Sequence, residues 1–286
     1  MTINCKGTLL DLETPKIMAI LNATPDSFFD GSKSSDMPSL LTRSETMLLE
    51  GATIVDVGGY SSRPNAEFVT EKEEINRVVP IISSIIKNFP ETIISIDTFR
   101  SGVAKAAVEN GAAIVNDISA GALDSEMLTT IASLRVPYIM MHMRGNPKTM
   151  QKLTDYDNLT KDLLFYFSEK IALARELGIS DIIIDPGFGF AKTTAQNFEL
   201  MRNLALFKTL ELPLLVGISR KSMIYKSFET TPENALNGTT ALNMVALQKG
   251  AKILRVHDVK EASECIKIYN LLNEISDDDT VHSSES

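Results

Sequence analysis

Eight short apolar runs recur along this 286-residue chain, and they constrain its fold more than any other feature. Each run is bounded by turn residues and followed by a segment with helical periodicity, which is the pattern of repeated strand–helix units. The runs are apolar throughout, as expected for strands of a parallel sheet that is covered on both faces. The predicted strands are residues 16–21, 52–57, 92–96, 112–115, 137–141, 181–184, 212–216 and 251–256. The predicted helices are residues 38–50, 71–88, 101–110, 125–134, 156–177, 194–210, 232–249 and 260–275.

The number of units predicts an α/β fold of the (β/α)8 TIM-barrel class, which takes roughly 250 residues. Residues 2–12, with Lys6 and Gly7 at their centre, are expected to form a short N-terminal β-hairpin that plugs the lower mouth of the barrel. Residues 1–275 are therefore predicted to be a single barrel domain. Residues 276–286 are acidic and rich in serine, with nothing to bury, so we expect a disordered tail there.

Charge and cysteine content exclude several classes of protein. A formal net charge of −9 argues against general affinity for nucleic acid, which requires a basic face. Cys5 and Cys265 lie at opposite ends of the chain without metal-ligand spacing, so we expect reduced thiols and a cytoplasmic location. Each apolar run is shorter than the roughly 20 residues of a membrane helix, and the first residues lack the features of a signal peptide. We therefore expect a protein that binds neither nucleic acid nor membranes.

Polar side chains stand at the end of nearly every predicted strand. In barrels of this class, the catalytic groups come from the carboxyl ends of the strands and from the loops that follow them. Taken singly, each of these residues is explained as a helix cap or a turn former, but a ring of them on one rim favours an active site. They are Asn22, Asp56, Asp97, Asn116, Asp117, His142, Asp185, Ser219, Arg220, Lys221, Arg255 and His257.

Three of these residues indicate how a ligand would be recognised. Asp97, Asn116 and Asp185 offer several acceptors and one amide that both donates and accepts. This set suits a flat heterocycle that presents N–H and amine donors along one edge. Paired carboxylates also hold divalent metals or act as acid–base pairs, and the residues alone leave that alternative open.

A second set of rim residues indicates an anion site. Arg255 and His257 alternate along the last strand and so point to the same side, and Asn22 ends the strand that neighbours it when the barrel closes. They would hold an oxyanion leaving group, although a basic residue at a strand end also pairs with a nearby acid. The connections 22–37 and 58–69 are long and rich in hydrogen-bonding side chains, which predicts binding loops or a mobile lid.

The chain resembles the dihydropteroate synthase family of pterin-binding barrels from residue 16 to residue 272. Any one of the matching motifs is weak, but seven of them occur in the family's order at the predicted strand ends. They are L-N-A-T-P-D-S-F at 21–28, D-V-G-G-Y-S-S-R-P at 56–64, S-I-D-T at 95–98, N-D-I-S at 116–119, I-D-P-G-F-G-F at 184–190, S-R-K-S at 219–222 and R-V-H-D at 255–258.

The resemblance implies a transferase of folate biosynthesis. Such an enzyme condenses 6-hydroxymethyl-7,8-dihydropterin pyrophosphate with para-aminobenzoate to give 7,8-dihydropteroate and pyrophosphate. Pyrophosphate leaves a methylene that is attached to an electron-rich ring, which favours a dissociative substitution. Asp97 and Asp185 would then stabilise positive charge on the pterin, while Arg255, His257 and a metal ion would stabilise the departing anion.

The family's site residues carry over to the matching positions of this chain. The pterin would be held by Asp97, Asn116, Asp185 and Lys221, with Met140 and Phe190 as apolar walls. The pyrophosphate would be held by Asn22, Arg255 and His257, with Mg²⁺ as the expected cofactor at Asn22. para-Aminobenzoate would lie near Phe28, Ser62, Arg63, Pro64, Phe190 and Ser219. The groups assigned to catalysis are Asp97, Asp185, Lys221, Arg255 and His257.

The loop at 58–69 departs from the family pattern. The family has G-E-S-T-R-P-G where this chain has G-Y-S-S-R-P-N, so Tyr60 replaces an acid, Ser62 a threonine and Asn65 a glycine. These changes alter the expected fit around para-aminobenzoate. Sulfonamides resemble that substrate, so we expect them to compete for its site.

Two further expectations concern the class of protein and its assembly. The alternative function is a methyltetrahydrofolate-binding barrel of the methyltransferase type, or a non-catalytic pterin-binding protein. The S-S-R-P, S-R-K-S and R-V-H-D stretches together argue against both. The helical segment 235–247 carries more apolar residues than one buried face needs, which predicts a homodimer.

Overall fold

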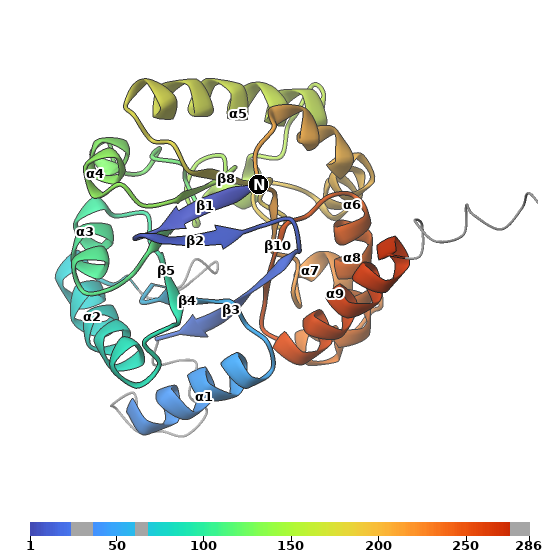
Figure 1. Cartoon of the computed structure of the whole chain (residues 1–286). Helices are drawn as coiled ribbons and strands as arrows, with labels where there is room; N and C mark the ends of the chain where they lie inside the picture. Colours follow the sequence, from blue (N-terminus) through green and yellow to red (C-terminus); the bar gives the residue numbers. More distant parts are fainter. Residues whose placement is uncertain (24–36, 61–67, 275–286) are drawn as a thin grey trace, which may run out of the picture.

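Eight parallel strands form a ring that is surrounded by helices (Figure 1). The computed structural model describes residues 1–23, 37–60 and 68–274. The strands are β3 (Lys16–Asn22), β4 (Ile54–Gly58), β5 (Ile93–Asp97), β6 (Ile114–Asp117), β7 (Tyr138–Met141), β8 (Ile182–Asp185), β9 (Leu215–Val216) and β10 (Ile253–Val256). Their order is β8-β7-β6-β5-β4-β3-β10-β9, and a parallel bridge between Ile184 and Leu214 brings the two ends of the sheet together. The predicted TIM barrel is confirmed.

The helices cover the outside of this ring. They are α1 (Met37–Leu49), α2 (Glu71–Asn88), α3 (Ser101–Glu109), α4 (Met127–Leu134), α5 (Leu159–Glu176), α6 (Thr194–Asn203), α7 (Ser222–Tyr225), α8 (Leu236–Gln248) and α9 (Val259–Glu274). The described residues also form short 3₁₀ helices, which are η2 (Met150–Lys152), η3 (Leu204–Leu210) and η4 (Pro232–Asn234). Within the described ranges, no helix is both long and apolar enough to cross a membrane.

Helix boundaries differ from the prediction where caps intervene. The helix predicted from residue 156 begins at Leu159, because the Asn158 side chain accepts a hydrogen bond from the Lys161 amide and caps it. The helix predicted over 194–210 is α6 followed by the 3₁₀ helix η3. The short helix α7 was not predicted. The tail predicted at 276–286 lies outside the described residues.

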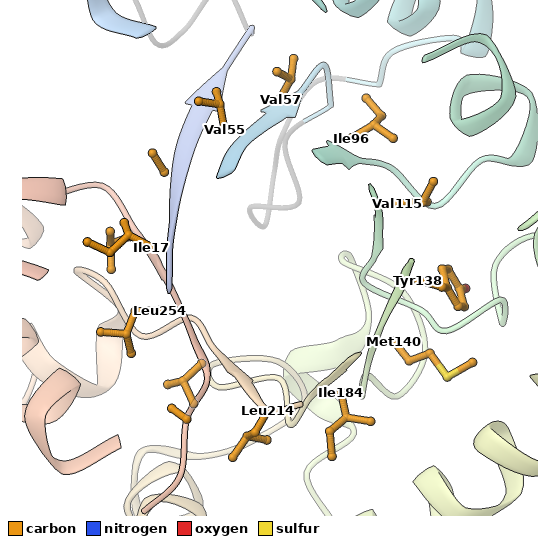
Figure 2. Close-up of a cluster of buried hydrophobic side chains, with 14 of the residues drawn as sticks. Ile17, Val55, Val57, Ile96, Val115, Tyr138, Met140, Ile184, Leu214 and Leu254 are labelled. Atoms are coloured by element: carbon orange, nitrogen blue, oxygen red, sulfur yellow. The ribbon is translucent and has the colours of Figure 1, made fainter. Parts of the chain in front are cut away.

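Side chains alternate along each strand between the helix layer and the barrel interior. Those that point outward pack under the helices, as Figure 2 shows for Ile17, Val57, Val115, Met140 and Leu254. The lowest interior layer is entirely apolar and consists of Met18, Ile54, Ile93, Ile114, Ile139, Ile183, Leu215 and Ile253. Two residues further along, the inward positions are Ile20, Asp56, Ser95, Asn116, Met141, Asp185, Gly217 and Arg255. The interior therefore changes from apolar to polar within one layer.

The predicted N-terminal hairpin closes the lower mouth of the barrel. Strands β1 (Thr2–Cys5) and β2 (Thr8–Asp11) pair antiparallel around a turn at Lys6 and Gly7. Ile3, Leu10 and Leu12 join the same apolar cluster as the lowest interior layer. Figure 1 looks onto this end and shows the hairpin crossing it. Access to the polar layers is therefore from the opposite end, where the strands terminate.

Candidate active site

A pocket lies at the carboxyl ends of the strands, and the second interior layer forms its floor. This rim pocket is lined by Asp97, Asn116, Ile118, Met141, Asp185, Phe190, Gly217, Lys221 and Arg255. The structure thus brings together six residues that the sequence assigned to ligand binding: Asp97, Asn116, Asp185, Phe190, Lys221 and Arg255. A neighbouring hollow, lined in part by Lys192, Thr193 and Lys226, contains none of the predicted site residues.

Arg255 is the charged centre of the rim pocket. Its Nε donates to Asp56 Oδ2 at 2.7 Å, and its Nη2 donates to Asp97 Oδ2 at 2.6 Å. The guanidinium thereby spans from β10 past β3 to carboxylates on β4 and β5. The sequence left two interpretations for Arg255, an anion clamp and a partner of nearby acids. The contacts of Nε and Nη2 show the second, and the anion role stays a prediction.

Burial changes the proton affinity of the groups around Arg255. Burial raises the pKa of Asp97 to about 7, with Arg255 opposing the rise and Asp56 adding to it. Burial also raises the pKa of Asp185, against the attraction of Lys221. For Arg255, burial alone would lower the pKa, but the facing carboxylates of Asp56 and Asp97 raise it overall. The guanidinium therefore stays charged while Asp97 exchanges its proton near neutral pH.

Lys221 reaches the rim pocket from the loop after β9. Its Nζ donates to the Phe188 carbonyl at 2.5 Å and lies 4.9 Å from the centre of the Phe190 ring. Burial lowers the pKa of Lys221 to about 8, and the carboxylate of Asp185 limits that fall. Lys221 thus carries a positive charge at neutral pH beside an aromatic wall.

The loop 186–190 is shaped by Gly187, which has a φ of 73°. A Cβ atom there would lie 2.1 Å from the carbonyl oxygen of His142, so only glycine fits. The Gly187 amide donates to Asp185 Oδ1 at 2.8 Å, which orients that carboxylate. The I-D-P-G-F-G-F motif is therefore one unit that places Asp185 and Phe190 on the same pocket.

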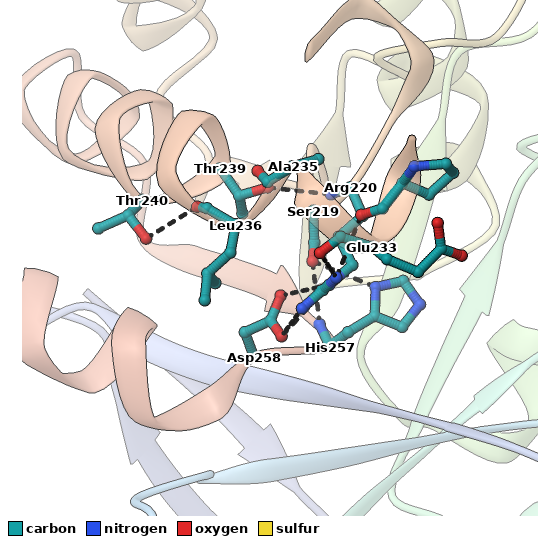
Figure 3. Close-up of polar contacts among 10 residues, drawn as sticks. Ser219, Arg220, Glu233, Ala235, Leu236, Thr239, Thr240, His257 and Asp258 are labelled. Atoms are coloured by element: carbon teal, nitrogen blue, oxygen red, sulfur yellow. Dashed lines mark hydrogen bonds and ion pairs between the residues drawn. The ribbon is translucent and has the colours of Figure 1, made fainter. Parts of the chain in front are cut away.

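The loops after β9 and β10 are joined by ion pairing, as Figure 3 shows. Arg220 Nη2 donates to Asp258 Oδ1 at 2.7 Å, and its Nη1 donates to the carbonyl oxygens of Pro232 and Glu233. Beside this pair, Ser219 Oγ accepts from the His257 amide at 3.2 Å and lies 3.1 Å from His257 Nδ1. The S-R-K-S and R-V-H-D motifs thus depend on each other for their position at the rim.

One predicted pocket residue was wrong by one position along its strand. Met140 is fully buried in the layer between barrel and helices (Figure 2), and Met141 lines the rim pocket instead. Neighbouring residues of a strand face opposite sides, so both cannot reach the interior. The apolar wall opposite Phe190 is therefore assigned to Met141.

The other predicted residues lie beside the rim pocket or outside the described ranges. Asn22 ends β3, and its Oδ1 lies 3.8 Å from where a Cβ of Gly58 would be. Ser219 and His257 lie at the rim but do not line the pocket. The residues predicted to bind para-aminobenzoate that lie outside the described residues are Phe28, Ser62, Arg63 and Pro64.

Two buried polar residues beside the pocket were not assigned to it from the sequence. Asp56 was recognised only as a strand-end carboxylate, although it is fully buried and binds Arg255. Lys192, which is 4% exposed, was not considered; its Nζ donates to the Gly187 and Phe190 carbonyls at 2.9 and 3.0 Å. It also lies 3.1 Å from His142 Nδ1. A lysine among small and apolar residues, as in G-F-A-K, is the signal that could have revealed it.

Acidification is expected to destabilise the fold through His142. Burial, with help from Lys192 and Arg144, lowers the pKa of His142 from 6.5 to about 2. Below pH 6.5 the unfolded chain binds a proton at this histidine that the folded chain does not. The stability that depends on neutral His142 is therefore complete above pH 6.5 and declines toward pH 2. Each pH unit in that window is expected to cost about 1.4 kcal/mol of unfolding free energy.

Urea unfolding across this pH range measures the effect. The matched variant is His142→Asn, whose amide oxygen can still accept from Lys192 but takes up no proton. Its stability should decline less steeply with acidification than that of the parent. Equal slopes for the two proteins would contradict the assignment to His142.

Comparisons of the sequence with known proteins point to a single family. The family model described as "Pterin binding enzyme" matches residues 18–257. A dihydropteroate synthase of Synechocystis sp. is 45% identical over 259 residues, covering 90% of this chain and 89% of the relative. That of Escherichia coli is 42% identical over 274 residues, covering 94% and 95%.

Solved structures agree with these sequence matches. A Yersinia pestis dihydropteroate synthase in a sulfonamide drug complex superposes with a TM-score of 0.91 at 38% identity, covering 96% of this chain and all of that one. A Xanthomonas albilineans dihydropteroate synthase with 4-aminobenzoic acid superposes with a TM-score of 0.89 at 35% identity, covering 95% and 98%.

Proposed function

The chain belongs to the dihydropteroate synthases of the pterin binding enzyme family, transferases of folate biosynthesis, and we propose that its rim pocket is where the pterin pyrophosphate reacts with para-aminobenzoate. The observation that carries this location is the convergence of Asp97, Asn116, Asp185 and Lys221 on one pocket. Three of these residues supply acceptors for the N–H and amine edge of a pterin. Phe190 and Met141 supply apolar surfaces for its ring.

The charges of the pocket suit a substitution at the pterin methylene. In that step the carbon–oxygen bond to pyrophosphate breaks, and its electron pair leaves with the pyrophosphate. The amine nitrogen then forms the new carbon–nitrogen bond and loses one proton. The carboxylates of Asp97 and Asp185 favour positive charge on the ring, while Arg255 and His257 favour negative charge on the leaving group. Each group is fixed in place before the reaction begins.

Mg²⁺ is proposed as the cofactor that accompanies the pyrophosphate. In the parts of the chain that the structure describes, no three His, Cys, Asp or Glu residues are grouped to hold a metal ion. The Asn22 amide oxygen would be a single protein ligand, which fits an ion that keeps waters and binds substrate phosphates. When bound, Mg²⁺ would neutralise charge on the leaving group. Pyrophosphate binding to the protein, measured by titration calorimetry with and without Mg²⁺, should lose its dependence on the metal in Asn22→Ala.

Direct assay of pyrophosphate release tests the proposed function. Release from the dihydropterin pyrophosphate is expected to require para-aminobenzoate, and dihydropteroate should form in equal amount. A sulfonamide should raise the apparent KM for para-aminobenzoate and leave kcat unchanged. Tight pterin binding without any release of pyrophosphate would instead favour a non-catalytic pterin-binding protein.

A homodimer is proposed from the outer surface around α8 and α9. Phe228, Ile268, Leu271 and Leu272 are each more than half exposed there, at 57%, 52%, 59% and 58%. Apolar side chains exposed together often mark an interface. Light scattering at micromolar concentration should give twice the 31.4 kDa chain mass. The double variant Ile268→Glu, Leu271→Glu should give the chain mass itself.

The control for that experiment is Phe165→Glu, because Phe165 is 65% exposed on α5, and Figure 1 shows α5 on another side of the barrel from α9. It should remain a dimer. A parent protein of single-chain mass would contradict the proposal. A cytoplasmic location is also proposed, supported by the free thiols of Cys5 and Cys265, and fractionation of the source cells would test it.

A further inference from the structure

A single buried carboxylate oxygen connects two sides of the rim pocket. Asp56 is fully buried on β4, in the second interior layer. Its Oδ2 accepts from Asn116 Nδ2 at 3.0 Å and from Arg255 Nε at 2.7 Å. Asn116 stands on β6 and Arg255 on β10, so one atom of β4 holds residues from opposite directions around the barrel.

The contact with Asp56 decides which end of the Asn116 amide faces the pocket. A carboxylate that already binds a guanidinium accepts hydrogen bonds and offers none, so Asn116 must direct its NH₂ group toward Asp56. Its Oδ1 is then left for the pocket. Asp97 and Asp185 also present carboxylate oxygens there. By orienting Asn116, Asp56 thus gives the pocket a set of side chains that all present hydrogen-bond acceptors to a ligand.

The hydrogen bonds of Asp56 are otherwise incomplete. Its Oδ1 is buried and has no hydrogen-bond partner among the described residues, and the same holds for Ser95 Oγ. The two residues are neighbours in the β4–β5 register. A carboxylate buried only for stability is expected to have both oxygens satisfied. The unsatisfied Oδ1 therefore indicates that Asp56 serves the two residues that its Oδ2 binds, Asn116 and Arg255.

We propose that Asp56 is a positioning residue that locks Asn116 as a hydrogen-bond acceptor and so makes the pocket selective for a ligand edge made of donors. The proposal rests on the proposed function, because the donor edge is that of the pterin. Asp56 acts through Asn116 and through Arg255 Nε, without touching substrate itself. The hydroxyl-bearing neighbour Ser95 has no part in this role.

Two substitutions of Asp56 separate positioning from charge. Asp56→Ala removes the acceptor and frees the Asn116 amide to turn, so the Kd for 6-hydroxymethylpterin should rise about 10- to 100-fold, as for loss of a hydrogen bond to a buried group. Asp56→Asn keeps a carbonyl oxygen that accepts from both partners, and its Kd should stay within about threefold of the parent value. The control Ser95→Ala, at the adjacent buried position, should leave the Kd unchanged.

Nuclear magnetic resonance reads the amide directly. The Asn116 side-chain NH₂ signals, identified by their loss in Asn116→Ser, should exchange slowly with water in the parent and in Asp56→Asn, and rapidly in Asp56→Ala. This measurement needs no turnover, so it tests the inference even if the chain releases no pyrophosphate, an outcome that would count against the proposed function alone. Equal weakening by alanine and asparagine, or unchanged exchange in Asp56→Ala, would overturn the positioning role.

Discussion

Replacing Arg255 with alanine is expected to lower kcat/KM for the pterin pyrophosphate by roughly 100- to 1,000-fold, the usual cost of losing one preorganised charge partner of a developing anion. The guanidinium is also the shared partner of Asp56 and Asp97, at 2.7 and 2.6 Å. Without it, two carboxylates remain close together in a buried site. The free energy of unfolding should therefore fall by about 3–5 kcal/mol.

The variant Arg255→Lys separates these two effects. Lysine keeps the positive charge but lacks the planar fork that donates to both carboxylates at once. It should regain most of the stability while kcat/KM stays far below the parent value. Denaturant unfolding and steady-state pyrophosphate release measure the two quantities. If Arg255→Ala lost less than about tenfold in kcat/KM, which is only about 1.4 kcal/mol, the leaving-group role would be wrong.

Replacing Lys221 with methionine is expected to raise KM for the pterin pyrophosphate by about 100-fold, because the pocket loses the charged donor proposed to bind the pterin. Lys221 lies 4.9 Å from the Phe190 ring and has a pKa lowered to about 8 by burial, with Asp185 opposing the fall. The charged form exists below that pKa. In the parent, kcat/KM should therefore decline as pH rises past about 8.

The pH profile of Lys221→Met distinguishes loss of the Lys221 charge from a general loss of structure. In Lys221→Met the decline above pH 8 should disappear, since the titrating amine is gone. Lys226→Met is the matched control, because Lys226 lines the neighbouring hollow rather than the rim pocket. It should keep both the parent activity and the parent profile. A decline that persisted unchanged in Lys221→Met would assign it to another group.

Most strands could be predicted because burial on both faces leaves an uninterrupted apolar run. The exception is β9, which was predicted over 212–216 but forms a strand only at Leu215–Val216, with a single bridge from Leu214 to Ile184 before it. Pro213 lies in that run and has no amide hydrogen, so it can only accept, as it does from Ile184 N at 3.0 Å. A pattern of apolar residues does not reveal where the ladder of hydrogen bonds stops.

The uninterrupted apolar character of the strands also explains the wrong assignment of Met140 to the pocket. In P-Y-I-M-M every residue is apolar, so the sequence does not show which alternate residues face inward. Asp56 was difficult for a different reason. Its partner Arg255 lies 199 positions away, and such pairing depends on barrel closure rather than on local sequence. The residues proposed to touch ligand were predicted from the family motifs, whereas Asp56, which holds two of them, required the folded chain.

The apolar layer beneath the pocket floor separates two parts of the molecule that differ in what their substitutions are expected to change. Below the pocket floor, the hairpin packs on the lowest strand layer, and none of the residues in this apolar cluster is among those that line the rim pocket. Substitutions that raise thermal stability can therefore be sought in this apolar cluster, at positions such as Ile3, Leu10 and Ile54. Substitutions that change inhibitor binding are expected at the rim pocket instead. Substitutions in the apolar cluster that compensate for a loss of stability change no residue that lines the rim pocket.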